Sequence, residues 1–569
     1  MDKNGDQLRL SGPEPVPVTP LTSGPFAGED GAPSRILRSA ESLAHRLTQL
    51  GVEAQLASDV VWRISRVETF LAHRPPPVLP PPAIAPEPTV AETPDRRDTE
   101  DLIGPRPWER VPERSLSRLL RVGAALAVFA LCALIVWHIS DKFMRDGMHG
   151  LGSIYTIAIT TYVFSRFLLA AFYSPPEAVG LEPSIAIVVP AYNESDAVAR
   201  TIHSCLGLDY PAEKMEVVVI NDGSSDDTWE HMQRAAALYP PGRVRCVDLG
   251  SNQGKRAAMA AGIRATQAET LVFVDSDSMP APSAVRKLVQ GFADPKVGAI
   301  SGLTHVRNAD ANVLTRMQAA RYYISFQLLK AAESVVSAVS CCSGCFAAYR
   351  RSAVVPILEG WEHQRYLGIE CTYGDDRALT NMLLKSGWKA IYDSEAEAWT
   401  DAPHRYGKFF NQQLRWKKSW AREGPILSAH LWRSRPLAFP AALVATLSGL
   451  LSPVVVLWNL AWEPLGRGLN PSFYLLCLYL MSIIYALMYR ALRSDGVWLY
   501  AIAATFFYIS FSLQLFWAIL RIRDGKWGTR EQTPVAPAPP APPVEPAPQA
   551  PRVEPAPQAP AALADASMA

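Results

Sequence analysis

The sequence predicts an α/β fold, a doubly wound and mostly parallel sheet, set between membrane-spanning helices. Three observations lead to this prediction. Residues 183–430 alternate β-branched runs with helical patterns, which is typical of such a sheet. Apolar blocks of about 20 residues, the length that crosses a bilayer, precede and follow that region. Both ends of the 569-residue chain are rich in proline and are expected to be disordered.

The N-terminal region, residues 1–112, contains the run HRPPPVLPPPAIAPEP at 73–88, which cannot form a packed core. Apolar residues at helical spacing over 34–73 predict a helix or helix pair, with docking or self-association as its candidate role. The C-terminal region, 533–569, contains VEPAPQAP twice and is predicted to be a low-complexity tail.

Two apolar blocks, Val122–Ile139 and Leu151–Tyr173, predict a transmembrane hairpin within residues 113–175. The basic flank ERSLSRLLR before the first block places the N-terminus in the cytoplasm by the positive-inside rule, so the hairpin returns the chain to the cytoplasm. More than a hundred mostly polar residues precede the first block, which is therefore no signal peptide.

Three further apolar blocks lie within residues 437–520: Leu437–Trp462, Phe473–Tyr489 and Val497–Leu520. Three crossings would leave the C-terminus outside, whereas the basic run RIRDGKWGTR that follows favours the cytoplasm. We therefore predict that one block is re-entrant or broken, and Pro440 and Pro453 indicate the first. The segment 521–532 is then expected at the cytosolic face.

Charge and cysteine content exclude other classes. The net charge of +1 argues against nucleic acid as a partner, because phosphate binding needs an extended basic face. The eight cysteines form no disulfide framework and are expected to be reduced. Cys341, Cys342 and Cys345 lie close enough for a zinc site, but no second pair stands at ligand spacing, which favours small buried side chains.

Polar side chains follow three predicted parallel strands, in SIAIVVPAYNES, MEVVVINDGSSDDT and ETLVFVDSDSMP. Ligands of such sheets bind at the carboxyl ends of the strands. The candidates there are Tyr192, Asn193, Glu194, Asp222 and Asp275–Asp277. Loop acids also serve as helix N-caps, and Ser224, Ser225 and Asp226 are expected to include one.

Two pairs of carboxylates carry the chemistry. Asp275 and Asp277, two positions apart after a buried strand, are suited to Mg²⁺ or Mn²⁺ completed by substrate phosphate oxygens. Asp375 and Asp376 precede an amphipathic helix. A sugar hydroxyl that attacks a donor must lose its proton, and Asp376 is the candidate base, whereas Asp375 is equally suited to cap the helix.

The motifs PAYNES, INDGSSDDT and DSD, in this order and spacing, resemble family 2 glycosyltransferases of the GT-A fold. The resemblance implies that Tyr192 and Asp222 contact the uracil of a UDP-sugar, with Glu194 nearby, and that Asp275 lies near the ribose or metal. It also implies that Asp277 binds the metal and that Lys255 and Arg256 of NQGKRAA approach the diphosphate. The alternative for the last pair is a solvated helix start.

Five further motifs, which together cover residues 115–530, make the chain most similar to the hyaluronan synthases: GDDRALTN, TDAP, QQLRWKKSWARE, CSGCFAAYRRS and KWGTR. Related chitooligosaccharide synthases share part of this set but usually read GEDR where this chain reads GDDR, and other relatives make cellulose or chitin. One departure is Ser343-Gly344-Cys345, since hyaluronan synthases typically have SGP followed by an apolar residue.

This resemblance implies a multi-pass enzyme of the plasma (inner) membrane, with its catalytic domain in the cytoplasm and a growing polysaccharide as acceptor. It adds Ser343, Gly344 and Arg377 to the substrate-binding residues, and Trp527 and Arg530 as part of a segment that closes over the nucleotide. That segment's alternative role is a basic topology anchor.

The stretch NQQLRWKKSWARE is expected to form a helix whose two faces have different roles. Gln412, Arg415 and Trp416, at i, i+3 and i+4, share one helix face suited to the diphosphate and to an acceptor sugar on the indole. Lys417, Lys418 and Arg422 are expected to anchor the helix beside anionic lipid headgroups.

Three alternatives stay open at this point. The first is a chitin-like or poly-N-acetylglucosamine synthase that uses UDP-N-acetylglucosamine alone. The second is an enzyme that adds a single sugar to a lipid or protein, and the third is an inactive membrane scaffold.

Overall fold

The computed structural model describes residues 150–467, 471–493 and 495–524, together with single positions between 123 and 137. The predicted helix at 34–73, most of the block Val122–Ile139, Trp527, Arg530 and the tail at 533–569 lie outside the described residues.

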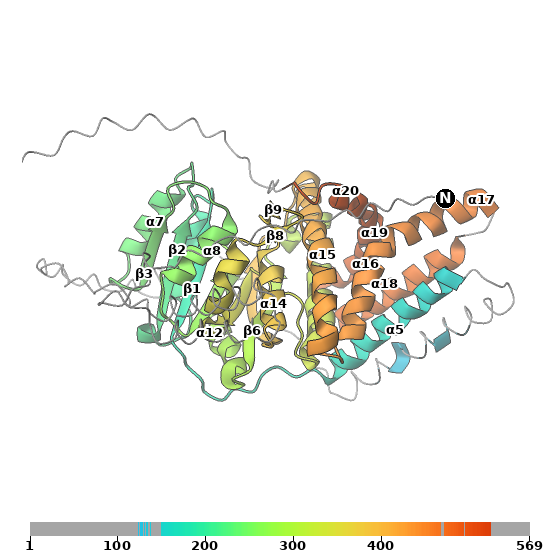
Figure 1. Cartoon of the computed structure of the whole chain (residues 1–569), viewed down its shortest axis with the longest axis horizontal. Helices are drawn as coiled ribbons and strands as arrows, with labels where there is room; N and C mark the ends of the chain where they lie inside the picture. Colours follow the sequence, from blue (N-terminus) through green and yellow to red (C-terminus); the bar gives the residue numbers. More distant parts are fainter. Residues whose placement is uncertain are drawn as a thin grey trace, which may run out of the picture. The chain divides into compact units, whose positions relative to one another are not determined.

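A mixed sheet of eight strands forms the α/β region, in the order β3-β2-β1-β4-β7-β6-β10-β5 (Figure 1). All strands run parallel except β7, which is antiparallel to β4 and β6, and β5, which is antiparallel to β10. The mostly parallel sheet that the sequence predicted is therefore present. The bounds are β1 Ile185–Ala191, β2 Met215–Asn221, β3 Val244–Asp248, β4 Thr270–Val274, β5 Met279–Pro280, β6 Val297–Val306, β7 Phe346–Arg350 and β10 Lys389–Thr400.

Helices cover both faces of this sheet, so β1, β4 and β6 are buried along their whole length and read as continuous apolar runs. One core contains residues of α8 and α14, and the other contains residues of α6, α7 and α9. The bounds are α6 Ala197–Leu206, α7 Thr228–Ala237, α8 Lys255–Arg264, α9 Ala284–Leu288, α12 Arg351–Val354, α13 Leu358–Glu362 and α14 Asp375–Lys385. A small hairpin, β8 Arg365–Tyr366 and β9 Ile369–Glu370, precedes α14.

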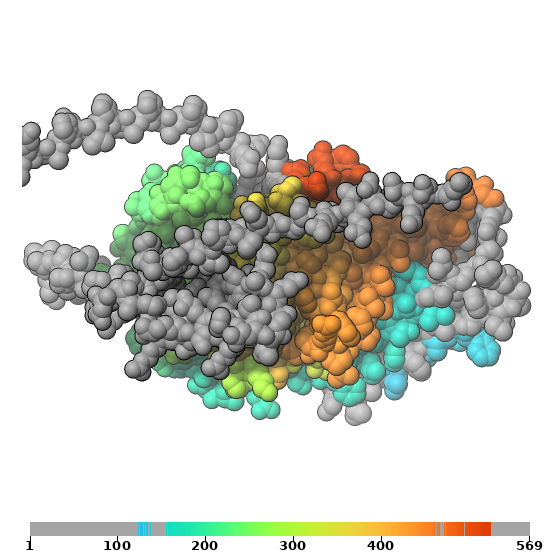
Figure 2. All heavy atoms as spheres, viewed as in Figure 1, coloured from blue at the N-terminus to red at the C-terminus, as the bar shows by residue number. Residues whose placement is uncertain are grey.

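A second group of helices surrounds the long helix α15, Tyr406–Ser434, which packs against α14 on one side and against α16 and α20 on the other (Figure 1). Helix α5 lies beside α16, where Tyr155 Oη donates to the carbonyl of Ser448 at 3.4 Å. Figure 2 shows the atoms of α5 (cyan) next to those of the C-terminal helices (orange). The remaining bounds are α5 Gly150–Phe172, α10 Val313–Ile324, α11 Ala331–Val335, α16 Phe439–Leu457, α17 Glu463–Arg467, α18 Ser472–Leu492, α19 Tyr500–Ser510 and α20 Gln514–Leu520.

Three stretches among the described residues are helical, long and apolar enough to cross a membrane: Phe439–Gly466, Tyr474–Leu492 and Gly496–Leu520. They coincide with the three C-terminal blocks predicted from the sequence. The apolar helix Ile157–Phe172, within the second block of the predicted hairpin, is shorter.

The first C-terminal block is not broken at its prolines, contrary to the prediction. Helix α16 continues through Pro453 to Leu457 and is followed by the π-helical turn Trp458–Trp462. A proline cannot donate to the carbonyl four residues earlier, here Gly449, but the hydroxyl of Ser452 donates to that carbonyl at 2.9 Å. The α-helical winding is instead interrupted in the last block, by the 3₁₀ turn Phe511–Leu513 between α19 and α20.

Candidate active site

The residues predicted to bind the UDP-sugar donor, called here the donor half of the site, meet at one edge of the sheet. Tyr192, Asp222 and Asp275 directly follow the ends of β1, β2 and β4, and β7 begins beside them because it runs the other way. The buried carboxylate of Asp222 accepts hydrogen bonds from the backbone N–H of Gln253 (2.7 Å) and of Gly254 (3.0 Å). This fixes the loop that leads into α8, whose first residue is Lys255.

The loop after β1 is tied to the start of α7. Asn193 and Ser195 have left-handed backbone conformations, with φ of 52° and 45°. The backbone N–H groups of Glu194 and Ser195 both donate to the hydroxyl of Thr228 at 2.9 Å. The N-cap of α7 is Asp227, whose side chain makes no capping hydrogen bond, so the prediction of Ser224, Ser225 or Asp226 as the N-cap is wrong. The Asp226 carboxylate, one position earlier, accepts from the N–H of Thr228, the first residue of α7, at 3.1 Å.

Lys255 points to the end of β4, where its ammonium forms an ion pair with Asp275. Burial acts to lower the pKa of Lys255, but the Asp275 carboxylate outweighs it, so the pKa lies above its ordinary value. Lys255 therefore stays a cation, as a residue that contacts a diphosphate must.

Arg256 differs from the prediction. Its guanidinium is buried, and Nε donates to Asp375 Oδ1 at 3.1 Å while Nη1 donates to the carbonyl of Trp361 at 2.8 Å. The helix turn that directs Lys255 to Asp275 directs the next side chain into the protein interior. Arg256 thus contacts Asp375, which directly precedes the predicted base Asp376, and does not lie where a ligand of the diphosphate is expected.

Gly344 lies between the Lys255–Asp275 ion pair and Asp376. Its backbone N–H donates to Asp376 Oδ2 at 3.4 Å. A Cβ atom placed on Gly344 would lie 3.4 Å from Lys255 Nζ and 3.7 Å from Asp275 Oδ1. The motifs DSD, NQGKR, SGC and GDD, which are widely separated in the sequence, therefore converge on one glycine.

Asp376 is half-buried in the first turn of α14, beside the cysteine cluster. The thiol of Cys341 donates to Asp376 Oδ2 at 3.4 Å. Burial raises the pKa of this thiol, Asp376 adds to the rise, and Arg377 opposes it, so Cys341 is a neutral donor. Of the three clustered cysteines, Cys342 is fully buried in the core and Cys341 and Cys345 are half-buried.

Helix α14 is packed tightly on α15 at the residue before the acids. Gly374 has φ of 73°, which only glycine adopts readily, and an added Cβ would lie 2.6 Å from the Cβ of Ser419 and closer still to its hydroxyl. Arg422 of α15 donates to the carbonyl of Tyr373 at 2.8 Å. The start of α14 is therefore placed by α15.

The face of α15 predicted to contact substrate borders the same region. The indole of Trp416 is 42% exposed, and its ring centroid lies 6.0 Å from that of Tyr322. Burial raises the pKa of Tyr322 well above its ordinary value, with Asp277 adding to the rise and Arg415 opposing it, which places both charges near this phenol. Gln412 Oε1 is buried and has no hydrogen-bond partner among the described residues.

The prediction of a lipid anchor on the other face is wrong for all three cations. Lys417 donates to the carbonyl of Phe511 in the 3₁₀ turn and to Gln514 Oε1 (3.1 Å), and Lys418 donates to the carbonyl of Asp524 at 2.9 Å. Arg422 is 1% exposed. Helical spacing places Lys417 on the opposite face, which protein and not lipid covers, whereas Arg422 lies on the same face as Gln412 and Trp416 and contacts the start of α14.

Comparison with known proteins identifies the family. The model of "Glycosyltransferase like family 2" matches residues 183–419. A hyaluronan synthase of Streptococcus pyogenes is 33% identical over 294 residues, which make up 50% of this chain and 68% of the relative. An N-acetylglucosaminyltransferase of Azorhizobium caulinodans is 32% identical over 361 residues, 63% of this chain and 90% of the relative.

The chain belongs to glycosyltransferase family 2.

This family 2 glycosyltransferase is thus an enzyme, and the sheet order and the family together confirm the predicted GT-A fold. Among solved structures, the mannosyltransferase PcManGT of Pyrobaculum calidifontis, in complex with GDP-Man and Mn2+, aligns with a TM-score of 0.45 and 19% identity, over 72% of this chain and 99% of that one. The family and the three apolar helices indicate a membrane protein.

The glycosyltransferase offers oxygen ligands for a divalent cation at Asp277. The hydroxyl of Thr400 at the end of β10 donates to Asp277 Oδ1 at 3.2 Å and orients the carboxylate. No cluster of three or more His, Cys, Asp or Glu side chains suited to a metal occurs in the part of the chain that the structure describes. One or two carboxylates, completed by phosphate oxygens and water, fit Mg²⁺ or Mn²⁺ better than a metal held by protein alone.

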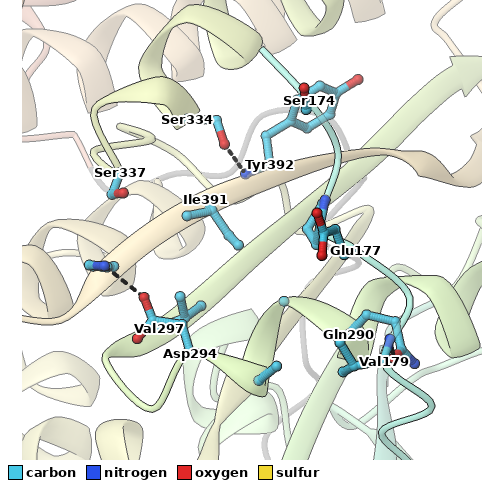
Figure 3. A pocket seen from close by; sticks show the side chains of 14 residues that line it. Ser174, Glu177, Val179, Gln290, Asp294, Val297, Ser334, Ser337, Ile391 and Tyr392 are labelled. Atoms are coloured by element: carbon cyan, nitrogen blue, oxygen red, sulfur yellow. Dashed lines mark hydrogen bonds and ion pairs between the residues drawn. The ribbon is translucent and has the colours of Figure 1, made fainter. Parts of the chain in front are cut away.

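A separate pocket lies at the opposite ends of β6 and β10, where those strands begin (Figure 3). Lys389 pairs there with Asp294 at 2.6 Å, and Ser334 Oγ accepts from the backbone N–H of Tyr392 at 3.0 Å. None of the predicted site residues lines this pocket, so it is not part of the candidate active site.

Sequence reasoning assigned no role to three residues that the structure places in or behind the site. Cys341 contacts Asp376, whereas the half-buried Gln364 and the buried Glu423 lie in a hydrogen-bond chain behind Asp375. Glu423 is the last residue of the motif QQLRWKKSWARE, and its membership of that motif was a signal that could have identified it. Gln364 stands in no motif, and only the fold brings it to this place.

Proposed function

We propose that this glycosyltransferase is a membrane-embedded processive synthase of the hyaluronan type. It would polymerise N-acetylglucosamine and glucuronate from their UDP-sugars by inverting transfer and export the chain across the plasma (inner) membrane. The observation that carries the proposal is the junction at Gly344, which places the Lys255–Asp275 pair and Asp376 around one small residue. A donor diphosphate and an acceptor hydroxyl must meet in such an arrangement.

The donor half would bind the UDP-sugar under the strand ends. Tyr192, Glu194 and Asp222 are the residues for the nucleotide, and Lys255 would contact the diphosphate. Asp277, with Asp275 nearby, would hold Mg²⁺ or Mn²⁺. When bound, the cation supplies positive charge that stabilises the departing UDP.

The acceptor half would act through Asp376. Its carboxylate accepts the proton of the acceptor hydroxyl while the hydroxyl oxygen bonds to the anomeric carbon and the bond from that carbon to the UDP oxygen breaks. Ser343 and Gly344 line the space beside the acceptor, and Arg377 adjoins the base. Gln412 and Arg415 would contact the diphosphate.

Trp416 is proposed as the platform for the acceptor sugar. Its exposed indole stands beside Tyr322, and a flat apolar ring binds a pyranose while permitting it to slide. The helices α16 and α19–α20 adjoin α15, and α18 packs on α19, so the elongated chain would pass from this platform into the membrane part. The α/β region would lie in the cytoplasm, where UDP-sugars are made.

Trp527 and Arg530 are proposed to close over the nucleotide. The residues just before them are tied to the site: the hydroxyl of Tyr373 donates to the carbonyl of Ile522 at 2.6 Å, and Lys418 binds Asp524. Self-association through residues 34–73 is a further proposal for this enzyme.

One experiment tests the sugar assignment. Membranes containing the enzyme are incubated with each UDP-sugar singly and in pairs, and the product is digested with a hyaluronan-specific lyase. Polymer made only from UDP-N-acetylglucosamine plus UDP-glucuronate, and digested by the lyase, is expected. A lyase-resistant polymer or transfer of a single sugar would contradict the hyaluronan assignment.

The second candidate is a chitin-like or chitooligosaccharide synthase that uses UDP-N-acetylglucosamine alone. The relative from Azorhizobium caulinodans favours it, because the alignment covers 90% of that N-acetylglucosaminyltransferase. Polymer formed from UDP-N-acetylglucosamine as the single donor would establish it. In either case, Asp376→Asn is expected to abolish UDP release, and near wild-type turnover would remove Asp376 as the base.

A further inference from the structure

A chain of hydrogen bonds, buried except at the half-buried Gln364, starts at Arg256 and connects four helices, α8, α13, α14 and α15. Besides its contacts to Asp375 and to the Trp361 carbonyl, Arg256 Nη1 donates to Gln364 Oε1 at 3.1 Å. The guanidinium lies over the Trp361 ring, 5.4 Å from its centroid. Trp361 Nε1 in turn donates to the carbonyl of Asp375 at 2.9 Å. Asp375 is thus held at its carboxylate and at its backbone.

The chain continues from Gln364 to α15. Gln364 Nε2 donates to Glu423 Oε1 at 3.0 Å, and Glu423 also accepts from Arg422 Nε (2.7 Å) and from Asn381 Nδ2 of α14 (2.9 Å). The Gln364 amide can adopt one orientation here, because a flip would set its NH₂ against a guanidinium and its oxygen against a carboxylate. Two buried ion pairs are therefore joined through a single amide.

We propose that Arg256 is a positioning residue for the proposed base and not a ligand of the donor diphosphate. Arg256 directly follows Lys255, and Asp375 directly precedes Asp376. The Arg256–Asp375 contact therefore fixes how far the donor lysine lies from the base, and Glu423 holds the same contact from α15. This inference rests on the proposed function, because it takes Asp376 as the base and UDP as the leaving group.

Charge explains why Arg256 stays in this position. The side chains of Arg256 and Asp375 are 5% and 7% exposed, so each neutralises a charge that is costly to bury alone. If the guanidinium turned to a diphosphate, Asp375 would be left buried without its cation. Lys255, in contrast, pairs with an Asp275 carboxylate at the site itself and is free of this constraint.

The test uses the full-length enzyme purified in detergent, with UDP as the binding probe. Arg256→Lys keeps the charge but cannot make the three contacts, and Glu423→Gln removes the charge at the far end of the chain. Both variants are expected to lower kcat by about 10- to 100-fold, since small misplacements of a catalytic group have effects of this size. UDP affinity by calorimetry and the KM for the donor are expected to stay unchanged.

Two control variants sharpen the result. Lys255→Met is expected to weaken UDP binding, and Arg234→Lys, on the exposed face of α7, is expected to change neither quantity. UDP binding by Arg256→Lys also shows that the variant is folded. Weakened UDP binding by Arg256→Lys, or unchanged kcat in both chain variants, would overturn the positioning role. Failure of the wild-type enzyme to bind UDP would instead overturn the proposed function, and this inference with it.

Discussion

Substitution of Gly374 is the sharpest test of how α15 places the base. Gly374→Ala has two costs. The left-handed backbone at φ of 73° disfavours any side chain by about 1–2 kcal/mol. The new methyl group would also lie 2.6 Å from the Cβ of Ser419, and overpacking of this kind typically costs about 1–3 kcal/mol. We expect a total loss of about 2–5 kcal/mol.

Gly368 provides a matched control, because it separates these two costs. It lies in the β8–β9 hairpin with φ of 83°, and no atom stands within 4 Å of an added Cβ. Gly368→Ala therefore carries the backbone cost alone. Thermal unfolding of the purified protein and UDP release measure the two variants side by side. Because relief of the clash moves the start of α14, Gly374→Ala is expected to lose activity about 100-fold, whereas Gly368→Ala should stay near wild type.

A second-site change completes this test. Ser419→Gly removes the Cβ and the hydroxyl that the new methyl group would meet, so Gly374→Ala combined with Ser419→Gly should recover part of the lost activity. Equal effects of the two alanine substitutions, or no recovery in the double variant, would show that close packing of α14 on α15 does not place the base.

Three further predictions follow from the same contacts. Trp416→Ala is expected to abolish polymer formation without changing membrane insertion. Product sizing measures the first quantity and membrane fractionation the second. Polymer of normal length would contradict the proposed platform role. Burial lowers the pKa of Lys417 to about 8, so the unfolded chain binds more protons than the folded protein between about pH 8 and 10.5. The free energy of unfolding should therefore rise with pH in this range. Lys417→Met should abolish the rise in thermal unfolding scans, and an unchanged rise would assign it to other groups. Removal of divalent cations with EDTA should stop transfer. Thr400→Val removes one of the hydrogen bonds that Asp277 Oδ1 accepts and should raise the Mg²⁺ or Mn²⁺ concentration needed for half-maximal rate, whereas an unchanged metal requirement would argue against Asp277 as the ligand.

The sequence predicted the donor half well because parallel strands align their carboxyl ends. Once three parallel strands were recognised, Asp222 and Asp275 were expected at the same edge of the sheet, and the structure places them there, after the strands on either side of β1. Arg256 could not be predicted in this way. Its partner Asp375 lies 119 positions away, and whether a cation at a helix start faces a ligand or the interior depends on packing that no local pattern records.

The assignment of Lys417, Lys418 and Arg422 to lipid failed for a related reason. Helical periodicity reveals how many faces a helix has but not what covers each of them. A basic face next to apolar blocks is compatible with headgroups, and it is equally compatible with backbone carbonyls. In this protein the 3₁₀ turn Phe511–Leu513 and the end of the last apolar stretch provide such carbonyls.

Helix α15 can therefore transmit position between the membrane part and the site. Six residues at helical spacing form one stripe along it, comprising Gln412, Arg415, Trp416, Ser419, Arg422 and Glu423. The first half of this stripe borders the proposed substrate region, and the second half contacts the start of α14. The opposite face binds the 3₁₀ turn Phe511–Leu513 and α20 through Lys417 and through the packing of Ala421 on Leu515 and Ala518. A shift of α20 would therefore move the proposed acceptor platform and the proposed base together, because both are fixed to the same helix.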